Sequence, residues 1–209
     1  VINPGDEVLV PTPYLVSYAD QIKMNEGVPV FVTATEEHHF KVTVDQLEAA
    51  RTDKTKVLLL NSPSNPTGMI YSREELEAIG NWAVEHDLLI LADDIYGRLV
   101  YNGNTFTPIS SISESIRQQA IVINGVAKAY AMTGWRVGYA VGNPEIIAAM
   151  GKIIGQTTSN LTTVAQYAGI EAFTGPQDTV ETMRQAFEAR LHTIYPLLAD
   201  VPVFAMVNP

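Results

Sequence analysis

Hydrophobic residues, many of them β-branched, form short continuous runs along the chain. The runs cover residues 7–10, 28–32, 57–60, 88–92, 120–123 and 137–141. From residue 57 onward they are apolar at successive positions rather than at every second one. This pattern is typical of strands that are covered on both faces. The runs therefore predict a sheet that lies between two layers of helices.

Helical patterns lie between these runs. Ser72 to Glu75 form a capping box, and the apolar positions that follow continue to Ala83. Because this helix lies between the runs 57–60 and 88–92, the spacing predicts a crossover unit with parallel strands. A shorter helical segment separates the first two runs. Further helices are predicted over residues 44–51, 144–155, 162–173 and 176–199, with a last strand over 203–207.

The composition is that of an ordinary globular protein, with 46% hydrophobic and 17% charged residues. No apolar run reaches the roughly 18 residues of a membrane-spanning helix. Residues 1–6 lack the basic and apolar regions of a signal peptide. We therefore expect a soluble, cytoplasmic protein with no membrane partner.

Charge and metal-ligand content narrow the classes of partner. The formal net charge is −10, and no cluster of Lys and Arg is present, which argues against nucleic-acid binding and favours small-molecule partners. The chain has no cysteine. The adjacent pair His38-His39 lies in a polar stretch, where we expect a solvated loop. We therefore predict no metal site.

The segment from Gly125 to Gly138 carries the strongest chemical signal. Lys128 lies among small residues, so a planar cofactor can crowd and partly desolvate its amine, which favours imine chemistry. Arg136 follows eight positions later on a glycine-rich turn and offers a planar, permanently charged group for a phosphate. An aldehyde-trapping lysine beside a phosphate-binding arginine suggests pyridoxal phosphate as the cofactor.

Polar residues follow the predicted strands at 57–60 and 88–92, where ligands bind in open α/β sheets. Asp93 ends an apolar strand, and a buried carboxylate needs a partner such as a protonated pyridine nitrogen. Three residues on, Tyr96 has a hydroxyl that can bond the phenolic oxygen of such a ring. Asn65 lies in a rigid turn rich in proline that can aim its amide into the same crevice. A plain turn at Asn65 and a capping role for Asp93 are the structural alternatives.

These segments resemble the class I and II pyridoxal-phosphate aminotransferases of the aspartate aminotransferase fold. The order Asn65-Pro-Thr-Gly, then Asp93-Asp-Ile-Tyr, then Ala-Lys128 and Trp-Arg136 is similar to the family pattern. Bacterial aspartate aminotransferases of the thermophile type are especially similar. The resemblance covers essentially all 209 residues. It implies an α/β fold with a three-layer, mostly parallel sheet, the large domain of fold type I, incomplete at both ends.

The resemblance also implies residue roles. Lys128 is expected to be the Schiff-base lysine and proton carrier, and Asp93 the partner of the pyridine nitrogen. Tyr96 and Asn65 are expected at the ring oxygen, and Arg136 at the phosphate. Leu15 departs from the family, which usually has an aromatic stacking residue at this position.

Two neighbouring departures concern the same cofactor. Tyr14 is expected either to replace the aromatic ring that Leu15 lacks or to be a core residue, which leaves the stacking weakened. Gly125 stands where many family members have a phosphate-binding serine. Asp94 stands where glutamate is more usual, a change that we expect to be neutral.

The expected activity is transamination between an amino acid and a 2-oxo acid, of the aspartate/2-oxoglutarate type. Residues 1–200 are expected to form an incomplete cofactor-binding large domain with an interdomain helix, and residues 201–209 the start of a truncated small domain. The intact protein is expected to be a homodimer, and the 209-residue piece alone to be inactive. Two alternatives remain open, a lyase of the same fold and a cofactor-sensing domain of a transcription regulator.

Overall fold

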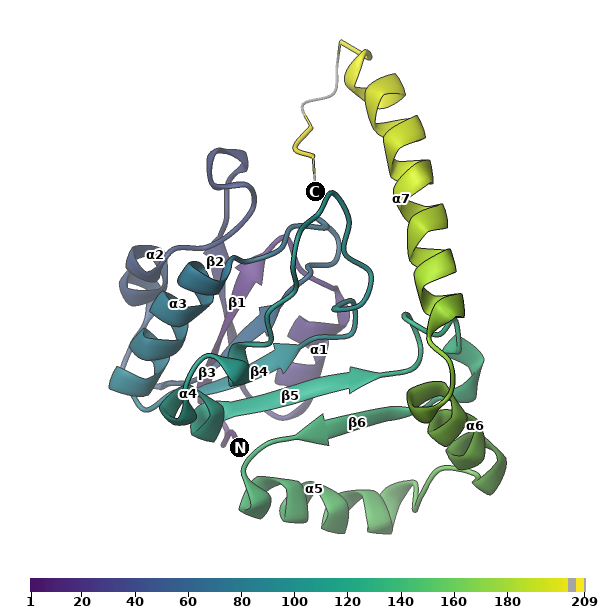
Figure 1. The fold of residues 1–209 in the computed structure, drawn as a ribbon. Helices are drawn as coiled ribbons and strands as arrows, with labels where there is room; N and C mark the ends of the chain where they lie inside the picture. The colour runs from purple at the N-terminus through teal and green to yellow at the C-terminus, as the bar shows by residue number, and fades with distance from the viewer. Residues whose placement is uncertain (203–205, 209) are drawn as a thin grey trace.

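The computed structural model describes residues 1–202 and 206–208. Its centre is a six-stranded sheet in the order β2-β1-β3-β4-β5-β6 (Figure 1). The strands are β1 (Glu7–Thr12), β2 (Val28–Thr33), β3 (Thr55–Asn61), β4 (Leu89–Asp93), β5 (Ala120–Gly125) and β6 (Gly138–Val141). All neighbouring strands are parallel except β5 and β6. The predicted α/β class with a mostly parallel sheet is confirmed.

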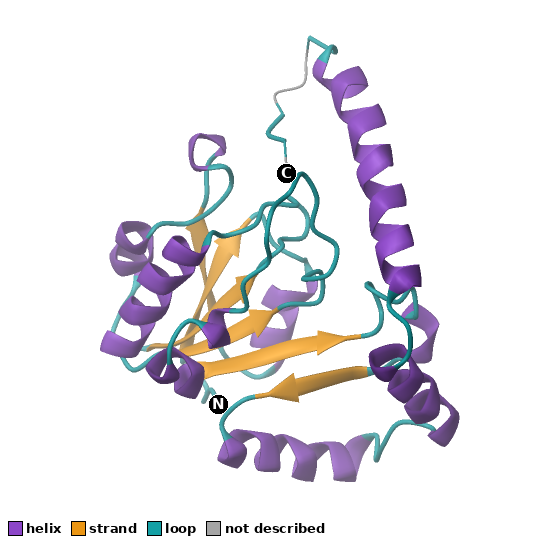
Figure 2. Cartoon of the chain, in the orientation of Figure 1, coloured by secondary structure: helices purple, strands orange, loops and turns teal. Residues whose placement is uncertain are grey.

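Helices connect the strands and cover the sheet (Figure 2). The α-helices are α1 (Ser17–Met24), α2 (Val44–Ala50), α3 (Arg73–Glu85), α4 (Glu114–Gln119), α5 (Pro144–Thr157), α6 (Thr163–Thr174) and α7 (Asp178–Ala199). Short 3-10 turns cover η1 (Glu36–His38), η2 (Ile109–Ser111) and η3 (Thr133–Trp135). The helices predicted over 44–51, 162–173 and 176–199 therefore form with ends shifted by one or two residues.

Alternate residues of the central strands face two separate hydrophobic clusters. Leu58 and Leu60 of β3 pack with α2, α3 and α4 on one face of the sheet. Val57 and Leu59 of the same strand pack with α1 on the other face. Because both faces of β3 are covered, every position from 57 to 60 can be apolar, as the sequence pattern indicated. The three layers follow from this division.

The predicted capping box begins α3. The Ser72 hydroxyl accepts a hydrogen bond from the Glu75 amide at 3.2 Å, and the Glu75 carboxylate accepts one from the Ser72 amide at 2.6 Å. These bonds satisfy backbone donors that the first helical turn leaves free. The apolar stripe of Leu76, Ile79 and Trp82 is then buried against the sheet.

Two strand predictions need correction. The run 137–141 was expected to be covered on both faces, but β6 begins at Gly138 and is an edge strand with Tyr139 and Val141 exposed. It pairs antiparallel with β5, and the connection between the two strands contains the 3-10 turn η3 but no α-helix. The strand predicted over 203–207 falls partly outside the described residues, and Met206 and Val207 have no strand pairing.

The C-terminal helices pack less tightly than the rest. In α5 no residue is buried, and in α7 only Val180 is. Figure 1 shows that α7 follows α6, begins near the end of β5 and extends from there beyond the sheet. The domain boundary at residue 200 remains a prediction. None of the helices in the described part of the chain combines the length and apolarity that a bilayer span requires.

Candidate active site

The carboxyl ends of β3 and β4 form the base of the site. Asn61 and Asp93 are register partners at these ends. The Asn61 side-chain nitrogen donates a hydrogen bond to the Asp93 backbone carbonyl at 2.9 Å. The Asn61 side-chain oxygen accepts one from the backbone amide of Asn65 at 2.7 Å. Asn61 thus fixes the loop that follows β3 against the end of β4. The rigid turn predicted around Asn65 acquires its orientation from these bonds.

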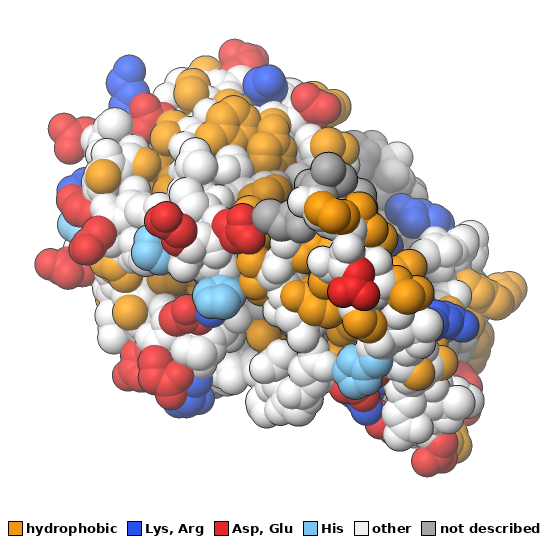
Figure 3. Space-filling view, turned by 90° about the horizontal axis from the view of Figure 1, so that it is seen from above, with side chains coloured by type: hydrophobic (Ala, Val, Ile, Leu, Met, Phe, Trp, Pro, Cys, Tyr) orange, Lys and Arg blue, Asp and Glu red, His pale blue; other side chains and the backbone are white. Residues whose placement is uncertain are grey.

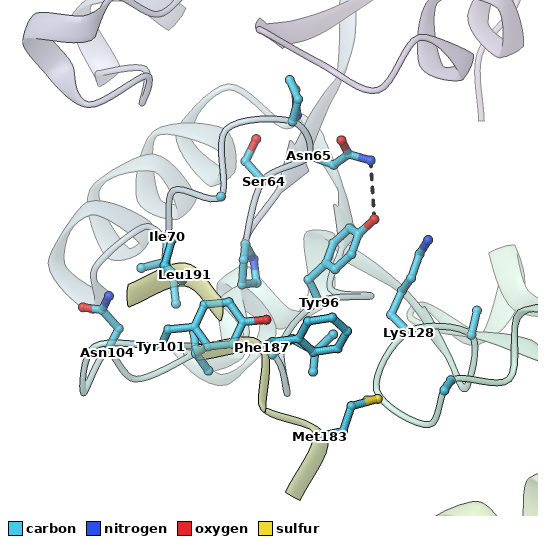
Figure 4. Close-up of a pocket in the computed structure, with 17 residues that line it drawn as sticks. Ser64, Asn65, Ile70, Tyr96, Tyr101, Asn104, Lys128, Met183, Phe187 and Leu191 are labelled. Atoms are coloured by element: carbon cyan, nitrogen blue, oxygen red, sulfur yellow. Dashed lines mark hydrogen bonds between the residues drawn. The ribbon is translucent and has the colours of Figure 1, made fainter. Parts of the chain in front are cut away.

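Three predicted residues meet at one cavity of about 510 Å³. Asn65, Tyr96 and Lys128 all line it, and they come from the loops after β3, β4 and β5. The Asn65 amide nitrogen donates to the Tyr96 hydroxyl at 3.4 Å, and the Lys128 ammonium lies 5.5 Å from the centre of the Tyr96 ring. Figure 4 shows these three polar groups pointing to the same side, away from Phe187 and Tyr101.

Lys128 lies inside a tight turn that follows β5. The Tyr130 amide donates to the Val126 carbonyl at 3.3 Å, and the Ala131 amide donates to the Lys128 carbonyl at 3.1 Å. The side chain is half-buried, and among residues 1–202 and 206–208 its ammonium makes no hydrogen bond or ion pair. Its contact is the face of the Tyr96 ring, a cation–π interaction. This amine is therefore available to a ligand in the cavity.

Asp93 ends β4 with a partner that the sequence did not reveal. Its carboxylate accepts a hydrogen bond from the buried Tyr18 hydroxyl at 2.6 Å and from the Ile95 amide at 3.2 Å. Burial, with the hydrogen bond to Asp93, raises the pKa of Tyr18, so the hydroxyl remains a donor at physiological pH. Asp93 is not among the residues that line the cavity with Lys128.

Asp94 is more deeply buried than Asp93, with 5% of its surface exposed. Burial, together with the negative charge of Asp93, raises the pKa of the Asp94 carboxyl to about 7.

Arg136 lies apart from the other predicted site residues. It is exposed and lines a neighbouring cavity of about 600 Å³ together with Trp135 and Asn160. Ala131 lines both cavities. Arg136 follows η3 in the left-handed conformation (φ 57°), and its guanidinium donates back to the Thr133 carbonyl at 3.1 Å. The structure therefore does not bring Arg136 into the cavity of Lys128.

The aromatic ring expected near the cofactor is engaged elsewhere. Tyr14 stacks on Phe31, with ring centres 5.2 Å apart and planes at 19°. Tyr14 and Leu15 both pack against the hydrophobic cluster on the α1 face. Tyr14 is half-buried and lines a small cavity with Asn61 and Asn65, so both alternatives for its role stay predictions. Neither residue lines the cavity of Lys128.

Sequence reasoning missed several residues of the site. Tyr18 is an apolar-face residue of α1, and its link to Asp93 spans 75 positions. Asn61 had a visible signal, an amide at the end of an apolar run. Met183, Phe187 and Leu191 of α7 line the cavity, and their spacing of four residues is the available sign of one helical face.

Charged side chains of both signs are mixed on one face of the molecule. On the face in Figure 3, Lys and Arg side chains are scattered singly among acidic ones, and hydrophobic side chains gather towards the middle. Such a face lacks the basic patch that neutralises nucleic-acid phosphates. The four histidines form no metal cluster, because no group of possible ligands gathers in the described residues.

Fold and site together define an α/β protein with an available lysine at the carboxyl edge of its sheet. The sequence matches the family Aminotransferase class I and II over residues 1–209. An asparagine–oxo-acid transaminase of Streptococcus mutans is 76% identical over 100% of this chain and 53% of its own length. The aspartate aminotransferase of Bacillus sp. (strain YM-2) is 56% identical with the same coverage.

Solved structures agree with these sequence matches. The aspartate aminotransferase from Rhizobium meliloti superposes with a TM-score of 0.90 at 39% identity, over 93% of this chain and 49% of that one. A Thermus thermophilus aspartate aminotransferase mutant gives 0.94 at 39% identity, over 100% and 57%. The chain belongs to the class I and II aminotransferase family, whose cofactor is pyridoxal 5′-phosphate. It spans about half the length of the curated relatives it matches.

Proposed function

We propose that the complete protein is a transaminase that moves an amino group from aspartate to 2-oxoglutarate with pyridoxal 5′-phosphate. The observation that carries the proposal is the Lys128 amine, which has no hydrogen bond in the described part of the chain and faces Tyr96 beside Asn65. The family match, which covers the whole chain, supports transamination rather than the reaction of a lyase or the role of a regulator domain.

The residues present fit the cofactor by their chemistry. The amine of Lys128 suits an aldehyde, and the Tyr96 hydroxyl and Asn65 amide suit a phenolic oxygen. The Asp93 carboxylate, held by Tyr18, suits a protonated ring nitrogen. Arg136 suits a phosphate, and this role requires the phosphate to reach the neighbouring cavity that shares Ala131.

When bound, the cofactor supplies an aldehyde that bonds to amines and a ring that withdraws electrons from the substrate. Lys128 would hold the cofactor until the amino group of the substrate displaces its amine, and the freed amine would then accept a proton from the substrate Cα and return it as an acid. Asp93 would stabilise the protonated ring nitrogen, and Tyr96 and Asn65 would bind the phenolic oxygen. Met183 and Phe187 give the Lys128 cavity an apolar wall.

Asparagine is a second candidate donor, because a relative that is 76% identical bears the name asparagine–oxo-acid transaminase. We further propose a cytoplasmic homodimer. Exposed apolar side chains on α5 and α6, such as Ile153 and Tyr167, support an interface there, because large exposed apolar patches often mark contacts between proteins.

Substituting Lys128→Ala in the complete gene product tests the proposal. We expect amino transfer from aspartate to 2-oxoglutarate to fall by about 10²–10⁴-fold, the usual contribution of one acid–base group. Oxaloacetate and glutamate are measured together, and transamination yields equal amounts of both. The same assay with asparagine ranks the two donors.

Lys23→Ala is the matched control, since Lys23 is exposed on α1. It is expected to retain wild-type turnover. Full activity in the Lys128 variant contradicts the proposal. Release of ammonia without glutamate points to a lyase, and binding of cofactor without turnover points to a regulator domain.

A further inference from the structure

Gln177 lies at the junction between α6 and α7 and uses its whole side-chain amide in hydrogen bonds. Its nitrogen donates to the carbonyls of Ala172 at 3.1 Å and Gly175 at 2.7 Å. These two carbonyls belong to the end of α6 and the turn after it. These two hydrogen bonds fix the Gln177 side chain to the helix junction. Its oxygen points to the loops that follow β4 and β5.

The oxygen of the same amide accepts hydrogen bonds from two loops. The Tyr130 hydroxyl donates to it at 3.1 Å and the Arg98 guanidinium at 2.5 Å. The Arg98 guanidinium also lies over the Tyr130 ring, 5.6 Å from its centre. Tyr130 is two residues after Lys128, and Arg98 is two residues after Tyr96. One oxygen atom therefore joins the loops of both residues.

The junction is also the start of a wall of the Lys128 cavity. Helix α7 begins one residue after Gln177, and its side chains Met183 and Phe187 line the cavity with Lys128. Figure 1 shows the α6–α7 junction beside the end of β5, where the loop of Lys128 begins. A shift of α7 about its start would therefore be transmitted to both loops.

We propose that Gln177 is a positioning residue, whose amide oxygen holds the Lys128 and Tyr96 loops in register and couples them to α7. The inference rests on the proposed function. It deepens that function, because the placement of Lys128 against Tyr96 decides how well the amine reaches a cofactor aldehyde. Gln177 acts through Tyr130 and Arg98 and touches neither reactant.

The test measures how fast Lys128 of the complete gene product captures pyridoxal 5′-phosphate. Borohydride added at timed intervals fixes the bound cofactor, and peptide mapping reports the label on Lys128. Gln177→Met keeps the length of the side chain and removes all four hydrogen bonds. We expect capture to slow by roughly tenfold, the effect of losing one charge-assisted hydrogen bond. In steady-state assays kcat should fall more than KM rises.

Gln177→Glu separates the positioning role from a purely structural one. The carboxylate keeps acceptor oxygens for Tyr130 and Arg98 but loses both donors to α6. We expect it to restore the capture rate to the wild-type range. Gln185→Met is the control, because Gln185 of α7 bonds only Glu181 of its own helix among the described residues, and its capture rate should be unchanged.

Tyr130→Phe provides a second test that removes only the hydroxyl. It should slow capture by less than Gln177→Met does, because the Arg98 hydrogen bond remains, with no further loss when it is added to Gln177→Met. Wild-type capture in Gln177→Met, or equally slow capture in Gln177→Glu, overturns the inference alone. Failure of the wild-type protein to be labelled at Lys128 overturns the proposed function and this inference with it.

Discussion

At the scale of single residues, Asp93 and Asp94 show how two adjacent carboxyl groups acquire different environments. Asp93 is half-buried and accepts hydrogen bonds from Tyr18 and Ile95. Asp94 is buried beside it, which raises the pKa of its carboxyl to about 7, mainly through loss of solvent. The more usual glutamate at this position was expected to be an equivalent choice, and the burial of Asp94 gives this position a pH dependence of its own.

The raised pKa of the Asp94 carboxyl predicts that the stability of the folded protein changes with pH. The folded protein binds a proton at Asp94 up to about pH 7, whereas the unfolded chain releases it near 3.8, the ordinary pKa of an aspartic acid. The free energy of unfolding should therefore fall as pH rises from about 4 to about 7, by at most about 1.4 kcal/mol per pH unit. Urea denaturation of the cofactor-free protein across this range measures the slope.

Asp94→Asn should remove this contribution, since the amide does not titrate. Asp20→Asn is the control, because Asp20 is exposed on α1, and it should keep the wild-type slope. An unchanged slope in the Asp94 variant would show that another group is responsible.

At the scale of elements, the pairing of β5 with β6 depends on a position that has no room for a side chain. Gly125 pairs with Gly138 at the point where β5 ends. A Cβ at Gly125 would lie 2.6 Å from the Val137 carbonyl oxygen and 2.9 Å from the Gly138 Cα. Both atoms are backbone, so neither can move away cheaply. The serine that many family members have at this position has no space in this arrangement.

Gly125→Ala should therefore lower the free energy of unfolding by about 1–3 kcal/mol, the usual cost of forcing atoms into a packed site. Gly134→Ala is the matched control, because a Cβ at Gly134 would meet no described atom within 4 Å. Chemical denaturation compares the two variants with the wild type. Equal stability of both variants would mean that β6 can shift away from β5.

At the scale of the whole molecule, the helices after β6 carry several large apolar side chains that are exposed to solvent. Tyr167 is 70% exposed, Leu197 66% and Ile153 65%. The chain also spans about half the length of its curated relatives. We expect these helices to mediate self-association of the protein, because large exposed apolar patches often mark contacts between proteins.

Light scattering over a range of protein concentrations checks this expectation, and Tyr167→Lys, which places a charge on the exposed face of α6, should weaken the association. A protein that stays monomeric at every concentration would contradict it.

Much of the architecture follows from local sequence. The run 57–60 and the capping box at Ser72 identify β3 and α3 because burial on both faces and helix capping depend on neighbouring residues. The edge position of β6 was not visible, because an apolar run has the same appearance whether or not another layer covers it. The family resemblance was confirmed, and the roles of single site residues remain predictions.

The sequence by itself determined the α/β class and the chemical groups available to the site, Lys128 above all, because propensity, patterning and side-chain chemistry are local properties. Only the tertiary structure decided which groups meet. It placed Tyr18 on Asp93, joined the loops of Lys128 and Tyr96 at Gln177, and set Arg136 in a neighbouring cavity. Such contacts link residues far apart in the chain, and their distances depend on strand register and helix packing rather than on the identity of neighbours.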